Sequence, residues 1–310
     1  MNLNTITARV YGFMSFTRAV FSAVLWNCSY KYDINYITYY QKHIRYSDIM
    51  SMDRGDDMKT AIITGASSGM GREFVYAVDR YFSPDEIWVI ARREHRLAEL
   101  SEKCSARVRP LAMDLSDSVS FENIDSLLRQ EQPQICALVN AAGYGVFGEF
   151  EKLSLEEQLG IVDLNARSLT AMCRICLPNM APGGSIINLG SNSSWQPVPY
   201  MNVYAASKAY VLSFSRGLGR ELKSRNIHVM CVCPGWIRTE FFDRAVKDDT
   251  ITYFDRYYTA EQVVDKAMKD LRKKKTISIL GLPVRLQVAA VKHLPVSMVM
   301  NTWCRQQKKP

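Results

Sequence analysis

Short apolar runs alternate with longer amphipathic stretches along most of the chain after residue 57. Four segments, "KTAIIT", "EIWVIA", "VRPLAM" and "ICALVN", are predicted to form successive strands. The stretch "GREFVYAV", which follows the first run, has helical spacing instead. Strands that alternate with helices predict an α/β fold with a doubly wound parallel sheet and helices on both faces. Ligands are then expected at the carboxyl ends of the strands.

The first 57 residues show a different pattern and are interpreted as an N-terminal helical extension of a domain that spans 58–310. Arg18 interrupts the apolar stretch "ARVYGFMSFTRAVFSAVLWNCSY", and no run of 18 uncharged apolar residues occurs, so an amphipathic helix is predicted rather than a membrane span. A tyrosine-rich piece follows. Packing on protein is the favoured role, because tyrosines offer amphipathic contact area. A membrane-surface anchor, or a dispensable arm with Met58 as a functional start, is the alternative.

Composition narrows the class of protein without choosing a function. The 310 residues are 47% hydrophobic and 23% charged, as in globular proteins with a sizeable core. The formal charge of +8 is compatible with a phosphate-bearing cofactor, an acidic carrier protein or a membrane surface, and is too diffuse to indicate nucleic acid. The longest basic run, residues 272–275, is expected at a solvated helix end.

The eight cysteines show no disulfide framework and fit a reducing cytoplasm. Cys173 and Cys176 form a CxxC inside an apolar helical stretch, and no second pair follows at zinc-ligand spacing. Both are therefore interpreted as packing residues, and no metal site is predicted. None of the four histidines falls in a recognisable catalytic arrangement.

The turn after the first strand carries Gly65, Gly69 and Gly71 and leads directly into a helix. Free N–H groups and the dipole at a helix N-terminus attract a diphosphate, so this strand–turn–helix predicts a dinucleotide site. Arg92 at the end of the second strand favours the 2′-phosphate of NADP, although a solvated arginine pair there would leave NAD open. Asp114 ends the third strand, and Asn140, Ala141, Ala142 and Gly143 end the fourth.

The stretch "NVYAASKAYV" places Tyr204 and Lys208 four residues apart, so they share one face of a predicted helix. An ammonium group beside a phenol lowers the phenol's pKa from about 10. A phenol with such a pKa can exchange a proton near neutral pH. An incidental surface pair would show the same spacing, so the other motifs decide between the two readings.

Taken in order, these motifs resemble those of the short-chain dehydrogenase/reductase family. The resemblance covers about Lys59 to Gly281 and implies a Rossmann-type fold. It rests on the following matches: "TGASSGMG" at 64–71, Asp114, "NAAG" at 140–143, Asn165 in "IVDLNARSL", Ser191 thirteen residues before Tyr204, Lys208, Pro234-Gly235, and Thr239.

The resemblance implies hydride transfer between a nicotinamide and a carbonyl or alcohol, with the protein supplying the proton. By this resemblance, Tyr204 donates the proton, and Lys208 lowers the pKa of that tyrosine and holds the nicotinamide ribose. Ser191 orients the substrate oxygen, and Asn165 holds a water that relays protons. Helix or loop capping is the structural alternative for the last two. It places the cofactor, NADP(H) or NAD(H), against Gly65, Ser67, Ser68, Gly69, Met70, Gly71, Arg92, Asp114, Leu115, Asn140, Ala141, Ala142, Gly143, Tyr204, Lys208, Pro234, Gly235, Ile237 and Thr239.

The substrate region is expected after Pro234, in a loop of about 236–262, because aromatic residues concentrate there. These are Trp236, Phe241, Phe242, Tyr253, Phe254, Tyr257 and Tyr258, with possible additions from Trp195, Tyr200, Tyr144 and Phe147. Ordinary core and dimer packing is the alternative. In the tail, about 282–310, an amphipathic cover over the pocket is expected from Val284, Val288, Val291, Met298 and Trp303.

These features predict a cytoplasmic ketone reductase for a bulky hydrophobic substrate. The arm and the aromatic loop resemble bacterial hydroxysteroid dehydrogenases of the 20β type. A 3-oxoacyl thioester, delivered by an acidic carrier, is the competing substrate. A sensor or scaffold that binds dinucleotide without turnover is the alternative from another class, although such proteins often lose the tyrosine or the lysine. A homodimer or homotetramer is expected through about 155–176 and 203–222; membrane contact is possible but not favoured.

Overall fold

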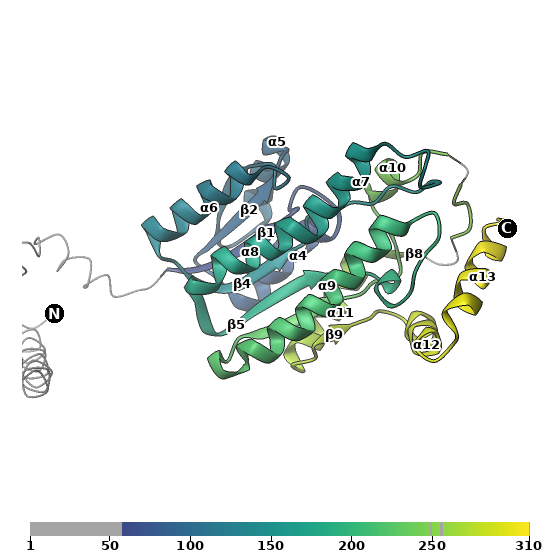
Figure 1. Ribbon diagram of the computed structural model, residues 1–310. Coiled ribbons are helices and arrows are strands. Elements are labelled where there is room, and N and C mark those ends of the chain that lie inside the picture. The colour runs from purple at the N-terminus through teal and green to yellow at the C-terminus, as the bar shows by residue number, and fades with distance from the viewer. Residues whose placement is uncertain (1–57, 249, 255–256, 310) are drawn as a thin grey trace, which may run out of the picture. The chain divides into compact units, whose positions relative to one another are not determined.

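A seven-stranded, fully parallel sheet forms the centre of the protein (Figure 1). The computed structural model describes residues 58–248, 250–254 and 257–309, so the predicted extension over 1–57 lies outside them. The strand order β3-β2-β1-β4-β5-β6-β9 reverses direction between β1 and β4, which is where a doubly wound sheet binds ligands. The strands are β1 (Lys59–Thr64), β2 (Glu86–Ala91), β3 (Arg107–Ala112), β4 (Gln134–Asn140), β5 (Met180–Leu189), β6 (His228–Val232) and β9 (Ile277–Ser278).

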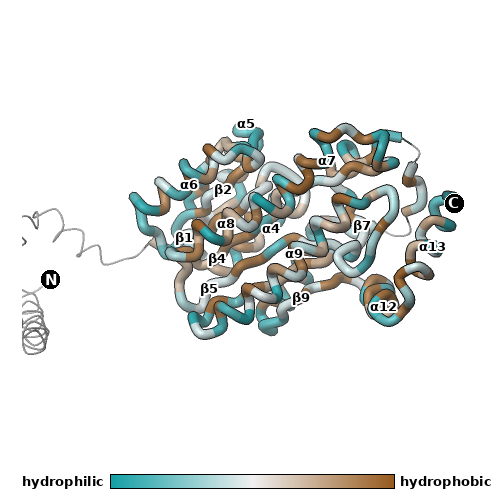
Figure 2. Tube along the Cα trace, viewed as in Figure 1, coloured by the Kyte–Doolittle hydropathy of each residue, from teal (hydrophilic) through white to brown (hydrophobic). Residues whose placement is uncertain are grey.

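Both faces of the sheet are buried along β1, β2, β4 and β6, which explains why these strands are continuous apolar runs rather than alternating ones, whereas the edge strand β3 carries Arg107 and Arg109 and is mostly exposed or half-buried. Successive residues of β1 point to opposite faces: Ala61 and Ile63 belong to one hydrophobic cluster and Ile62 to the other. Figure 2 shows hydrophobic colour along β5 and hydrophilic colour on the outer turns of α6. The first face is covered by α4 (Gly69–Phe82), α5 (Glu94–Ala98) and α11 (Ala260–Arg272), and the second by α6 (Ser118–Glu131), α8 (Ser168–Cys176) and α9 (Asn202–Glu221).

The predicted sheet is therefore confirmed, and so are two smaller expectations. Cys173 and Cys176 are buried free thiols in the second cluster. The basic run begins at Arg272, the last residue of α11, and continues beyond the helix. Lys275, at its end, forms an ion pair with the buried Asp270 of the same helix. None of the helices in the described part of the chain combines the length and hydropathy that crossing a bilayer would take.

Two segments that follow β6, residues 236–259 and the tail after β9, lie outside the main sheet and line or back the cavity at its carboxyl end. A two-stranded sheet pairs β7 (Trp236–Arg238) with β8 (Tyr257–Thr259), and α10 (Phe241–Ala245) follows β7. The tail forms α12 (Leu282–Val291) and α13 (Val296–Gln306). Val284 and Val288 are buried as expected, but Met298 is 55% exposed, because the neighbouring Val299 takes the buried position on α13.

Close packing of α4 on the turn after β1 fixes the start of that helix. An ideal Cβ on Gly71 would lie 2.1 Å from the carbonyl oxygen of Gly65, so only glycine fits there. The helix and the turn consequently approach each other backbone to backbone.

Gly71→Ala is expected to lower the free energy of unfolding by about 1–3 kcal/mol, because the new methyl group must displace backbone rather than a flexible side chain. Gly217→Ala in α9 is the matched control, since its Cβ would meet nothing within 4 Å. That change is expected to stabilise by up to about 1 kcal/mol through helix propensity. Urea unfolding of both variants measures the difference, and equal effects would contradict the packing argument.

Candidate active site

Two cavities that share part of their walls lie at the carboxyl end of the sheet. The turn cavity is lined by the glycine turn and by residues that follow β2, β3 and β4; the tyrosine cavity is lined by residues from β5, α9, the segment after β6, and the tail. The shared residues are Met70, Ala141, Gly143, Thr239 and Phe241. Groups bound in the two cavities would therefore be neighbours.

The turn cavity has the features of an anion site. Helix α4 begins at Gly69, and the side chain of Ser68, its N-cap residue, does not cap it, so its first N–H groups remain available to a ligand. Gly65 and Gly69 have φ angles of +67° and +52°, which favour glycine. A Cβ on Gly65 would lie 2.7 Å from the amide nitrogen of Ala142, so the floor of the cavity is bare backbone.

Arginines gather at the end of β2, on the side of the turn cavity away from the tyrosine. Arg93 donates from Nε and Nη2 to Ser67 Oγ at 3.3 and 3.0 Å. Arg92 Nη1 lies 3.8 Å from Asp114 Oδ2, and its side chain is 64% exposed. Both arginines line the cavity. The donor-rich turn and the cations beside it fit the diphosphate and the ribose 2′-phosphate of a dinucleotide.

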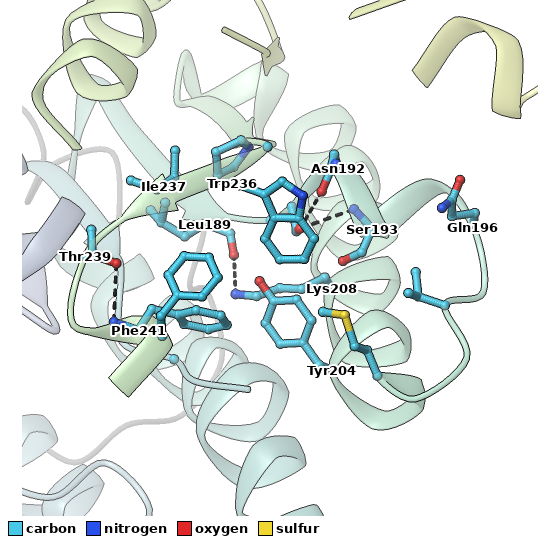
Figure 3. A pocket seen from close by; sticks show the side chains of 18 of the residues that line it. Leu189, Asn192, Ser193, Gln196, Tyr204, Lys208, Trp236, Ile237, Thr239 and Phe241 are labelled. Carbon is cyan, nitrogen blue, oxygen red and sulfur yellow. Dashed lines mark hydrogen bonds between the residues drawn. The ribbon is translucent and has the colours of Figure 1, made fainter. Parts of the chain in front are cut away.

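Tyr204 and Lys208 lie on α9 and both line the tyrosine cavity, as their spacing predicts. Figure 3 shows the two side chains converging below Trp236 and beside Phe241. Lys208 Nζ donates to the carbonyl oxygen of Leu189, the last residue of β5, at 2.8 Å. It lies 5.7 Å from the centroid of the Tyr204 ring. The lysine thus joins α9 to the end of β5 while facing the phenol.

The expected lowering of the phenol's pKa is wrong for the protein without ligand. Burial raises the pKa of Tyr204 to about 12, although a hydrogen bond with Ser191 opposes this shift. Burial also lowers the pKa of Lys208 to about 8, so its ammonium group loses its proton more readily than a solvated lysine does. Its charge does not offset the effect of burial on the pKa of the phenol. Desolvation acts on both groups in the direction that favours their neutral forms. The tyrosine consequently keeps its proton throughout the neutral range.

Ser191 follows β5 and lies at the N-cap of a short 3-10 helix, η4 (Asn192–Trp195). Its Oγ accepts from the backbone N–H of Ser193 at 3.2 Å and donates to Asn192 Oδ1 at 3.2 Å. The side chain therefore has a capping role, and it also lines the tyrosine cavity. The two roles coexist, because one lone pair of a hydroxyl oxygen is left after these contacts.

Asn165 lies in a π-helical turn, η2 (Asp163–Arg167), between α7 (Leu155–Val162) and α8. Single π-turns inside helices often mark functional positions. Asn165 Oδ1 accepts from the Tyr144 N–H at 3.0 Å, and Nδ2 donates to the Tyr144 carbonyl at 2.9 Å and to Ser207 Oγ at 3.0 Å. Both amide donors thus hold protein groups, and the buried side chain fixes the segment after β4 to α9.

Most predicted cofactor residues line the two cavities, but Asn140 does not. Its side chain is buried and donates to Asn188 Oδ1 at 2.9 Å, joining β4 to β5 beneath the cavity floor. Twelve positions line the turn cavity: Gly65, Ser67, Ser68, Gly69, Met70, Gly71, Arg92, Asp114, Leu115, Ala141, Ala142 and Gly143; Pro234, Gly235, Ile237 and Thr239 line the tyrosine cavity.

Aromatic side chains form one wall of the tyrosine cavity. Trp236, Phe241, Phe242 and Tyr253 line it, and Phe254 and Tyr257 pack behind Phe242 with ring centroids 5.3 and 5.4 Å away. The other expected aromatics do not line the cavity. Phe147 is buried behind the wall, with its ring centroid 6.2 Å from that of Trp236 and 6.1 Å from that of Phe241, and Tyr200 packs in the same cluster. Trp195 faces Arg216 and Lys292, Tyr144 lines the turn cavity, and Tyr258 packs against the cluster that contains Ala61 and Ile63.

The tail contributes three residues to this cavity: Gln287, Trp303 and Gln306. Trp303 Nε1 donates to the carbonyl oxygen of Pro199 at 3.0 Å, which holds α13 against the loop before α9. Gln307 accepts from the N–H groups of Thr252 and Tyr253, both at 3.0 Å. The expected cover is confirmed for Trp303, which packs against this chain's own residues.

Sequence reasoning missed Arg93, Gln287, Gln306 and Glu240. The residue expected to meet the ribose 2′-phosphate is the one at the end of the second strand, which is Arg92, and Arg93 follows it directly in "ARRE". Neighbouring residues at a strand end point in different directions, so the sequence alone cannot tell which of the two arginines faces the cofactor. Nothing local marks Glu240, which reaches Arg93 across 147 positions of sequence.

Comparison with known proteins agrees with this geometry. Residues 59–250 match the family model described as short chain dehydrogenase. Sulfoacetaldehyde reductase 2 from Chromohalobacter salexigens is 34% identical over 58% of this chain and 73% of its own length. The 17-beta-hydroxysteroid dehydrogenase type 3 of Danio rerio is 32% identical over 69% of this chain and 70% of its own.

A solved structure extends the likeness to the cofactor. The short-chain dehydrogenase from Sphingobium yanoikuyae in complex with NADPH is 29% identical and covers 75% of this chain and 92% of its own, with a TM-score of 0.65. The bare backbone and the arginines of the turn cavity fit a ligand of that kind.

Lys208 should leave a signature in the pH dependence of stability. Its pKa is about 8 in the folded state, below the ordinary value of 10.5 that applies to the unfolded chain. The folded state therefore loses this proton first as pH rises, and the penalty of burying the charge disappears between about pH 8 and 10.5. Relative to Lys208→Met, the wild type should gain about 3 kcal/mol of unfolding free energy across that window. Denaturant unfolding at several pH values measures the difference, and a constant difference would show that the lysine is not desolvated.

Proposed function

Because this chain belongs to the short-chain dehydrogenase/reductase family of NAD(P)-dependent oxidoreductases, we propose that it reduces a ketone on a bulky hydrophobic substrate, with a steroid as the favoured class. The observation that carries this proposal is the aromatic wall of the tyrosine cavity, opposite Tyr204. Large, mostly apolar ligands are bound by walls of this kind with a few polar groups placed among them. The likeness to a hydroxysteroid dehydrogenase supports it.

The turn cavity would hold the cofactor. The uncapped start of α4 and the backbone of Gly65 would bind the diphosphate, and Arg92 and Arg93 would bind a 2′-phosphate. When bound, the nicotinamide cofactor supplies a hydride to a carbonyl carbon or accepts one from an alcohol. The remaining tasks belong to side chains of this protein.

Tyr204 would donate its proton to the carbonyl oxygen as negative charge develops there. Its raised pKa suits the reductive direction, because the group stays protonated at neutral pH. Ser191 would turn its O–H from Asn192 Oδ1 to the same oxygen and orient it. Lys208, fixed by Leu189, would stabilise the phenolate that remains, and a bound anion nearby would favour its charged form.

Asn165 would act as a positioning residue. Its two bonds to the backbone of Tyr144 hold the segment after Gly143, and its bond to Ser207 reaches the helix that carries Tyr204. The water relay expected from the family remains compatible, since Oδ1 keeps one lone pair. This arrangement would keep the two halves of the site in register.

Two other functions remain testable. A 3-oxoacyl thioester would enter the same cavity and use the same proton donor, with a basic surface meeting its carrier. A non-catalytic dinucleotide sensor would need none of the four predicted catalytic residues, so their presence favours an enzyme. These residues are Asn165, Ser191, Tyr204 and Lys208. Assaying ketosteroids and 3-oxoacyl thioesters, each with NADH and NADPH, separates all three.

A homodimer through α7 and α9 is part of this proposal. Leu155 and Leu159 on α7 are 71% and 53% exposed, and Tyr210 on α9 is 43% exposed. Apolar side chains gathered on neighbouring helices favour contact with a second copy.

Tyr204→Phe is expected to reduce turnover at least about a hundredfold, the usual contribution of a positioned acid. NADPH binding should be kept, because the ring remains. Tyr210→Phe is the matched control: it lies on the same helix, and its hydroxyl contacts Thr170 instead of the cavity. Steady-state rates and NADPH fluorescence measure the two effects. Turnover retained in Tyr204→Phe would eliminate the proposed proton donor.

Trp303→Ala tests whether the tail helps select bulky substrates. Removing this ring should lower kcat/KM about tenfold or more for a ketosteroid and change it little for a small ketone, because only the bulky ligand would reach the tail. Met298→Ala on the exposed side of α13 is the control. Equal losses on both ketones would mean that Trp303 only stabilises the fold.

A further inference from the structure

Glu240 ties the segment after β7 to the arginines beside the turn cavity. Its Oε2 accepts from Arg93 Nη1 at 2.8 Å, and its Oε1 accepts from Arg96 Nη1 at 2.5 Å. Both carboxylate oxygens are therefore engaged by guanidinium groups from the start of α5 and the turn before it. A carboxylate held in this way occupies donors that an anionic ligand would otherwise use.

The position of Arg93 makes this competition specific. Its remaining nitrogens donate to Ser67 in the glycine turn, so one guanidinium lies between the turn and Glu240. Arg93, Glu240 and Ser67 all line the turn cavity. Arg92 lies next to them, close to Asp114. A phosphate group bound to Arg92 and Arg93 would consequently meet the Glu240 carboxylate as a like charge.

The geometry points to Glu240 as a residue that sets cofactor specificity: we propose that its carboxylate, held in place by Arg96, competes with the 2′-phosphate of NADP(H) for Arg93, and thereby limits the preference for NADP(H) over NAD(H). NAD(H) carries a free hydroxyl at that position and leaves the two ion pairs undisturbed. The inference concerns the cofactor alone and does not depend on the ketone proposed above.

The same tie reaches the substrate side through the neighbours of Glu240. Thr239 and Phe241 line both cavities, and the Phe241 ring lies 5.5 Å from the Tyr204 ring, centroid to centroid.

The side chains of Arg93, Arg96 and Glu240 are 39%, 36% and 45% exposed. Ion pairs this exposed are partly screened by water, so the expected effect on affinity is modest rather than absolute.

Glu240→Gln tests the proposal by direct binding. NADPH and NADH are titrated against the purified full chain, with nicotinamide fluorescence as the readout. The Kd for NADPH should fall about three- to tenfold, the range that two exposed ion pairs allow, while the Kd for NADH should change less than about twofold. The gain for NADPH should shrink as salt is raised, because screening weakens the competing charge.

Asp243→Asn is the matched control, since it removes the same charge from the same short helix segment at an exposed side chain. It should leave both Kd values within about twofold of wild type. An unchanged or weaker NADPH affinity in Glu240→Gln, or an equal gain for both cofactors, overturns the proposal. Absence of ketone turnover would count against the proposed function instead, because these Kd values do not depend on turnover.

Discussion

The parallel alignment of the seven strands is the constraint on which the site depends. It brings the carboxyl ends of β1, β4, β5 and β6 to one edge of the sheet, and every polar group of the two cavities is attached at or above that edge. The bond from Lys208 to the last carbonyl of β5 links the main helix of the site to this edge. Without that alignment, the glycine turn and Tyr204, 133 or more positions apart in the chain, would not share neighbouring cavities.

Burial decides the electrostatics of the tyrosine cavity. Burial raises the pKa of the Tyr204 phenol and lowers the pKa of the Lys208 ammonium, which reverses the effect on the phenol expected from their adjacency alone. With a pKa of about 8, the lysine still carries its charge through most of the neutral range, and an anionic partner bound nearby would stabilise that charge. The arginine side of the turn cavity differs, because the side chains of Arg92 and Arg93 are 64% and 39% exposed and their guanidinium groups remain in contact with water.

The sequence predicted those parts of the structure that depend on local spacing. Apolar runs gave the strands, because buried parallel strands need no alternation, and the four-residue interval gave the shared face of Tyr204 and Lys208. The remainder depends on tertiary contact. Whether Trp195 or Trp303 reaches the cavity is decided by packing between distant segments: Trp195 packs under Lys292, and Trp303 donates to the carbonyl oxygen of Pro199. The direction of the phenol's pKa shift likewise requires knowledge of what surrounds it in three dimensions.

The wall shared by the two cavities has a thermodynamic consequence. Met70, Ala141, Gly143, Thr239 and Phe241 would each face both ligands, so a shift of any of them on binding one ligand changes the space left for the other. Linkage then requires reciprocity: whatever factor the dinucleotide applies to substrate affinity, the substrate applies to dinucleotide affinity. The strength of the coupling between the two ligands would thus be set in part by five small or apolar residues that perform no chemistry themselves.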